Sequence, residues 1–258
     1  MSTVASSGRW QEVFPAEVVA LFVRDWHRPG SVDAMLIERM TPVTRVNARG
    51  LYAPPTEPPY RGGRPELEEH VRRVAGDAVH PVQAVVALLR FCHRLPQEFP
   101  SPERPAIAHL EAVRAGGREE EIIAEGNPLA AERARLLCAL AQVAGMPARV
   151  VHLARTDPAE RHTVTEVWTG TRWSVFDPFS GRFFTWPKHG YASAWDMHEL
   201  PRIADEKADH GRQRYVDSAY YRCIAVADYR ADEADRYAYD RDQLPPDLVQ
   251  RLRAGLGS

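Results

Sequence analysis

The chain has 258 residues, of which 44% are hydrophobic and 26% charged, and its formal net charge at pH 7 is −2. This composition predicts a globular protein with a buried core, and it excludes the global basic field that would attract nucleic acid or an anionic membrane. Lysine occurs at only two positions, so nearly all of the 33 basic residues are arginine. We interpret this bias as bacterial-type genome composition and not as a functional signal.

The three cysteines, Cys92, Cys138 and Cys223, are odd in number and widely spaced, and none of them belongs to a C-x-x-C pair. This pattern argues against a disulfide framework or a zinc knuckle and is typical of a reducing compartment. Residues Met1–Phe14 lack the basic stretch and apolar run of a secretory signal, and no segment approaches the length of a membrane span. We therefore expect a cytoplasmic protein without a membrane partner.

The N-terminal part is predicted to be an arm that ends in a linker, over residues 1–63. Apolar residues at helical spacing predict a helix between Val13 and His27, and a weaker pattern predicts a strand over Thr44–Leu51. The segment Tyr52–Pro65 carries four prolines and a Gly pair, so that neither a helix nor a strand can pass through it.

A core over residues 64–185 is predicted to begin with helices. Leu67, Val71 and Val74 indicate one helix, and a stronger pattern over 82–89 indicates a second, which Pro81 can open at its first turn. The acidic run 118–125 is predicted to be a short, solvated helix face. Residues 136–143 indicate a further helix, whose end is marked by Gly145 and Pro147.

The pattern then changes to strands. The segments "ARVVHL", "HTVTEVWTG" and "RWSVFDP" are rich in β-formers, and Thr169-Gly170-Thr171 is expected to join the last two as a hairpin. Helices followed by strands predict an α+β fold, with helices packed on an antiparallel sheet. Residues 186–258 are rich in aromatic side chains and are predicted to form a C-terminal extension that packs on this core.

Three motifs follow one another at the end of the predicted core. They are Gly145-Met146-Pro147-Ala148-Arg149 at the helix exit, His162 with Glu166-Val167 on one strand, and Trp173 with Asp177-Pro178 on the next. In this order and spacing they resemble the transglutaminase-like superfamily of papain-type thiol enzymes, over about Leu67 to Phe184. The resemblance implies an α+β transglutaminase-like core, a cysteine nucleophile assisted by His162 and Asp177, and no cofactor.

The position that the family gives to its cysteine is occupied here by Ala130. It lies fifteen residues before Gly145, and Glu132 and Ala134 fit the acidic and small positions that follow it, whereas Pro128 departs from the family's glycine. A thiol at a helix N-terminus is stabilised as thiolate by the helix dipole and a neighbouring imidazolium, which an aspartate orients. We expect a His162–Asp177 hydrogen bond, and we expect Cys92 and Cys138 to be buried small apolar side chains.

Three functions remain open on this evidence. The chain can be an inactive variant of a thiol acyltransferase or amidohydrolase that acts on an amide or thioester of a small-molecule or peptide acyl substrate, including a carrier-protein-bound one. It can instead be a native pseudoenzyme that binds a peptide, acyl or protein partner in the former cleft. In the third hypothesis the scaffold works without a thiol, through acid–base chemistry of His162 or through a metal held by His152, His162 and Asp177. The pattern predicts no oligomeric state.

Overall fold

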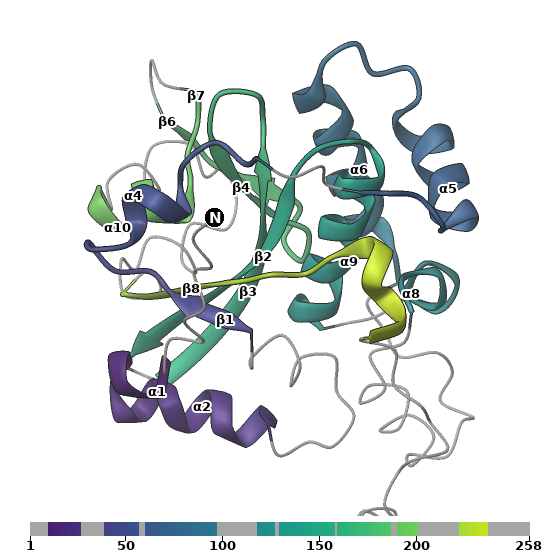
Figure 1. Ribbon diagram of the computed structural model, residues 1–258. Coiled ribbons are helices and arrows are strands. Elements are labelled where there is room, and N and C mark those ends of the chain that lie inside the picture. Colours follow the sequence, from purple (N-terminus) through teal and green to yellow (C-terminus); the bar gives the residue numbers. More distant parts are fainter. Residues whose placement is uncertain are drawn as a thin grey trace, which may run out of the picture.

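The computed structural model describes residues 10–26, 39–56, 60–96, 118–126, 129–157, 159–186, 190–200 and 222–236 (Figure 1). Its helices are α1 (Trp10–Val13), α2 (Ala16–Trp26), α4 (Ala48–Leu51), α5 (Pro65–Ala75), α6 (Pro81–Arg94), α8 (Glu119–Glu125), α9 (Ala130–Val143), α10 (Ala194–Glu199) and the 3-10 helix η4 (Ala231–Arg236). Its strands are β1 (Met40–Pro42), β2 (Ala148–Thr156), β3 (Ala159–Trp168), β4 (Trp173–Asp177), β5 (Arg182–Phe183), β6 (Thr185–Trp186), β7 (Gly190–Tyr191) and β8 (Cys223–Ala227). This arrangement confirms the α+β class.

The main sheet is antiparallel and has the strand order β1-β8-β2-β3-β4-β5, while β6 and β7 form a separate ribbon. The longest pairing joins β2 and β3, from Ala148 opposite Val167 to Thr156 opposite Ala159. Strand β8 lies between β1 and β2, although it comes last in the sequence. The predicted N-terminal arm and C-terminal extension therefore both add strands to the sheet of the core.

Both faces of the main sheet are covered. Helices α5, α6, α8 and α9 lie on one side of it and α4 and α10 on the other, as Figure 1 shows. The alternation of side chains along β2 follows this division, since Val150 belongs to the core under α9 and Val151 to the core under α10. No helix within the described ranges combines the length and the apolarity needed to cross a membrane.

The predicted helices of the core are confirmed. Helix α6 has Pro81 as its first residue, and α9 contains the predicted helix over 136–143 and is followed by Gly145 at φ +82°. The helix expected between Val13 and His27 is α2. The predicted hairpin is also confirmed, since Trp168 of β3 lies opposite Trp173 of β4.

The strand predicted over Thr44–Leu51 is wrong. The Asn47 side chain accepts a hydrogen bond from the Thr44 N–H at 2.8 Å and donates one to the Pro42 carbonyl at 2.8 Å. These two bonds close a turn that competes with an extended conformation, and α4 follows it directly. The strand of this region is β1, which ends before the turn.

The predicted solvated helix over 118–125 is found as α8, but its first residue is buried. Glu119 is 0% exposed, and its carboxylate accepts hydrogen bonds from Arg64 at 2.8 Å, from Arg135 and from the Tyr229 hydroxyl. Burial by itself would raise the pKa of Glu119, but the charges of Arg135 and Arg64 and the bond from Tyr229 lower it below its usual value. Glu119 therefore joins four separate segments of the chain as an anion.

Helix α9 is buried from Ala131 to Gln142 although it carries charged side chains. Arg135 donates to Glu132 from Nε at 3.1 Å and from Nη2 at 2.6 Å, in addition to its bond with Glu119. At the other end of the helix, Gln142 donates to the carbonyls of Ala148 and Tyr229, at 2.8 and 2.7 Å. Polar contacts therefore fix both ends of α9.

We predict that Arg135→Met lowers the free energy of unfolding by about 3 to 5 kcal/mol, because it leaves the carboxylates of Glu119 and Glu132 buried without their shared cation. Arg72→Met is the control, since the Arg72 side chain is 69% exposed beside Glu69, and it should cost less than about 0.5 kcal/mol. Urea unfolding of both variants measures the difference. Equal, small losses would contradict a structural role for the buried ion pairs.

Candidate active site

His162 of β3 and Asp177, the last residue of β4, form a close pair. His162 Nε2 lies 3.1 Å from Asp177 Oδ2, which confirms the expected hydrogen bond. Asp177 is completely buried, whereas the His162 side chain is 14% exposed. A carboxylate can only accept, so Nε2 carries the proton, and proton exchange with a substrate is left to the other ring nitrogen, Nδ1.

The turn after β4 holds the Asp177 carboxylate. Oδ1 accepts from the backbone N–H groups of Phe179 at 2.9 Å and Ser180 at 3.3 Å, and Oδ2 accepts from the Ser180 hydroxyl at 2.6 Å. Burial opposes ionisation of Asp177, but the charge of His162 and the hydrogen bonds from His162 and Ser180 lower its pKa below the usual value. Asp177 is therefore an ionised carboxylate that orients the imidazole.

The strand register places this pair at the end of the β3–β4 pairing. The pairing of β3 with β4 ends with Thr165 opposite Phe176, so that Asp177 lies level with Val164 and His162 lies beyond the paired residues. Because side chains alternate, His162 leaves β3 on the opposite face from Thr165, whose hydroxyl donates to the Ala134 carbonyl of α9 at 2.7 Å. The turn after β4 also contacts α6 of the helical layer, through the Phe179 carbonyl and His93.

Ala130 is the first residue of α9, so the expected nucleophile position does lie at a helix N-terminus. Three residues later, the buried Arg133 donates to carbonyls at the end of α6. The acceptors are Cys92 at 2.5 Å, His93 at 3.3 Å, Leu95 at 2.9 Å and Pro96 at 2.7 Å. Among these carbonyls, that of Cys92 also accepts a long bond from the Leu95 N–H at 3.4 Å. Carbonyls at a helix C-terminus lack the usual helical partners, so the bonds from Arg133 satisfy them and fix the start of α9 against α6.

Burial and a raised pKa make the native thiols unsuited to act as nucleophiles. Cys92, Cys138 and Cys223 are free and buried. Burial raises the pKa of Cys92 to about 12, and it raises that of Cys138 well above the usual value. The prediction that Cys92 and Cys138 are buried small apolar side chains is confirmed.

The metal hypothesis required His152 and His162 on one face, and the structure separates them. His152 lies opposite Thr163 and Leu153 lies opposite His162, so the two imidazoles leave the sheet on opposite faces. His152 Nδ1 is 3.2 Å from the Thr163 hydroxyl, and Phe22 packs against the ring. In the part of the chain that the structure describes, no three His, Cys, Asp or Glu side chains are grouped for a metal ion.

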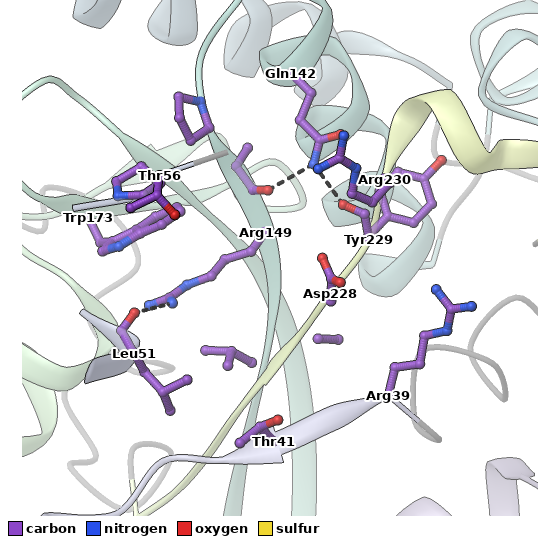
Figure 2. A pocket seen from close by; sticks show the side chains of 15 residues that line it. Arg39, Thr41, Leu51, Thr56, Gln142, Arg149, Trp173, Asp228, Tyr229 and Arg230 are labelled. Carbon is purple, nitrogen blue, oxygen red and sulfur yellow. Dashed lines mark hydrogen bonds between the residues drawn. The ribbon is translucent and has the colours of Figure 1, made fainter. Parts of the chain in front are cut away.

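A groove of about 380 Å³ lies at the other end of β2 (Figure 2). Arg149 reaches across it, with its guanidinium 4.2 Å from the ring centre of Trp173 and bonded to the Leu51 carbonyl at 2.6 Å. Arg149 is four residues before Leu153, the partner of His162, which corresponds to about 13 Å along the strand. The groove is therefore separate from the His162–Asp177 pair.

Sequence reasoning identified the pair but missed the residues that support it. Ser180 and Phe179 act largely through backbone N–H groups, and Arg133 acts on backbone carbonyls. The proximity of Ser180 to Asp177, three residues apart in a turn, is the one signal that pointed to a contact.

Residues 107–178 match the sequence model of the Transglutaminase-like superfamily, a segment that includes Ala130, His162 and Asp177. No curated protein and no solved structure matches the chain. The matched segment ends with the Asp177-Pro178 motif, and the fold around it is the expected α+β arrangement of helices on an antiparallel sheet. The matched segment is therefore similar to the transglutaminase-like superfamily.

Proposed function

We propose that this domain is an acyl-transfer or amide-hydrolysis scaffold of the thiol-enzyme type, in which Ala130 occupies the nucleophile position. The observation that supports the proposal most is the His162–Asp177 pair, because its carboxylate is buried, ionised and held by three bonds from the following turn. Such a pair fixes one imidazole tautomer and stabilises the imidazolium, as general acid–base catalysis requires.

The mechanism follows from the roles of these positions. With cysteine at position 130, a thiolate at the α9 N-terminus attacks an amide or thioester carbonyl and forms a C–S bond. His162 donates a proton from Nδ1 to the leaving amine or thiol as the original bond breaks. His162 then takes a proton from water or an acceptor amine, which attacks the acyl enzyme as the C–S bond breaks and releases the thiolate, so that the thiolate and the imidazolium are restored. Asp177 remains ionised throughout.

With Ala130 the first of these steps has no nucleophile, because a methyl group cannot attack a carbonyl. The proposed activity of this chain is therefore binding of an acyl substrate without turnover. A native pseudoenzyme and an inactivated enzyme share this geometry and this outcome. The substrate class is an amide or thioester on a small molecule, a peptide or a carrier protein, and the free thiols suit the reducing cytoplasm that we propose as its location.

This proposal predicts that the protein has no thiol-dependent amidase or transamidase activity. Cys92 and Cys138 are buried, with raised pKa values, so neither can act as the nucleophile. The measurement is ammonia release or amine incorporation with a panel of acyl substrates, before and after alkylation under native conditions. Activity that alkylation abolishes would show that one of the native thiols reaches the site.

The proposal also predicts that Ala130→Cys creates a thiol with an apparent pKa below about 7.5, compared with about 8.5 for a free cysteine. The rate of iodoacetamide labelling between about pH 5 and 9 measures this pKa, with the label located by peptide mapping. His162→Ala in the same background should raise the apparent pKa, and Asp177→Asn should raise it by less, since Asp177 acts through the ring.

Pro65→Cys is the matched control for this experiment. It places a thiol at the first residue of α5, a helix of 11 residues with acidic residues in its first turn, so that it keeps the helix dipole but lacks the imidazole. If the thiols at positions 130 and 65 titrate alike and His162→Ala changes neither, the start of α9 does not face the pair and the proposal fails.

The lowered pKa of Asp177 predicts a pH-dependent stability difference. Because the folded-state pKa lies below the unfolded value of about 3.9, the carboxylate stabilises the protein above about pH 5, and this contribution is lost as the pH falls through the folded-state pKa. Asp177→Asn should therefore cost about 2 to 3 kcal/mol at pH 6 and much less near pH 3. Urea unfolding at both pH values measures it, and the exposed Asp157→Asn serves as control. A difference that grows on acidification would contradict the assignment.

A further inference from the structure

The turn that holds Asp177 is itself held by a second histidine. His93 lies in the last turn of α6, and its Nδ1 is 3.1 Å from the Phe179 carbonyl oxygen. Since a carbonyl can only accept, Nδ1 is the donor. Figure 1 shows that α6 lies beside α9 on one side of the sheet, so this bond connects the helical layer with the end of β4.

Gly181 makes room for the His93 ring. A Cβ built on Gly181 would lie 2.7 Å from His93 Cδ2, and the residue has φ +70°. Both the close approach and the left-handed backbone favour glycine at this position. The imidazole thus lies close against the turn as well as bonding to it, and these two contacts fix its position.

Contacts continue from His93 in both directions. On one side, the Phe179 and Ser180 N–H groups bond to Asp177, which bonds to His162. On the other side, Arg133 of α9 donates to the carbonyls of Cys92 and His93. His93 therefore lies on a continuous path from the first turns of α9 to the imidazole of His162.

We propose that His93 is a positioning residue for the His162–Asp177 pair. Its imidazole fixes the Phe179–Gly181 turn, and the turn fixes the carboxylate that orients His162. His93 acts through the backbone of the turn and touches neither the substrate nor the reacting atoms. The role of His93 in catalysis rests on the proposed function, whereas the energetic coupling between His93 and Asp177 does not depend on it.

The coupling is tested in the chain with Ala130 by a double-mutant cycle of His93→Leu and Asp177→Asn. We expect the two effects on the unfolding equilibrium constant at pH 7 to be non-additive by about threefold or more. His93→Asn should retain stability better than His93→Leu, because its amide can donate from nearly the same place as Nδ1. His80→Leu is the control, since His80 lies exposed at the opposite end of α6 and should be additive with Asp177→Asn.

Additive effects of His93→Leu and Asp177→Asn would overturn the proposal, whatever the chemistry at position 130. The reaction itself is tested in the Ala130→Cys background, where His93→Leu should raise the apparent pKa of the introduced thiol and His93→Asn should leave it nearly unchanged. If His162→Ala raises that pKa and His93→Leu does not, the contact is structural only and the positioning role is refuted. If neither substitution changes it, the proposed function fails, while the stability cycle still decides whether His93 supports Asp177.

Discussion

The burial of charged side chains along helix α9 is the constraint on which the rest of the structure depends. Glu132, Arg133 and Arg135 are each at most 2% exposed, and an unpaired charge in such a place would cost several kcal/mol. Glu132 pairs with Arg135 within the helix, whereas Arg133 and Arg135 also bind partners elsewhere in the chain. Arg135 bonds to Glu119 at the start of α8, and Glu119 in turn bonds to Arg64 just before α5. Arg133 bonds to carbonyls at the end of α6. A buried ion pair adds little net stability compared with apolar packing, but it allows few alternative arrangements, and this property defines where the first turn of α9 lies.

That fixed helix start gives the His162–Asp177 pair a functional interpretation. A histidine that bonds to a buried aspartate is also found as a purely structural feature, so the pair alone does not identify an active site. Here the pair lies level with the end of β4, and the turn after β4 contacts α6, whose last carbonyls are bound by α9. Groups far apart in the sequence are thus connected by contacts of defined geometry. In the proposed function, position 130 at the start of α9 is where a cysteine would supply the nucleophile.

The sequence predicted those elements whose apolar residues repeat with a regular helical or strand period. It did not predict the features that tertiary contacts determine. The spacing of Leu136 and Leu140 predicted the second half of α9. Hydrophobic periodicity assigns charged residues to the exposed face of a helix, so it did not predict the burial of Arg133. Asn47 turned a predicted strand into a turn through two hydrogen bonds. Strand β8 was missed because five apolar residues within an aromatic-rich segment have no distinctive period. His162 and Asp177 were identified through the spacing of a family resemblance, whereas His93 was not, because its partner is a backbone carbonyl that any sequence supplies.

The proposed function requires that the N-terminus of α9 faces the imidazole of His162 around the end of β4. A crystal structure of the Ala130→Cys variant tests it most directly, through the distance between the introduced Sγ and His162 Nδ1. The proposed function predicts that these two atoms lie within about 4 Å, close to hydrogen-bonding distance. A sulfur atom that points away from the ring, with Nδ1 beyond about 6 Å and so beyond the reach of a single bridging water, would contradict the claim.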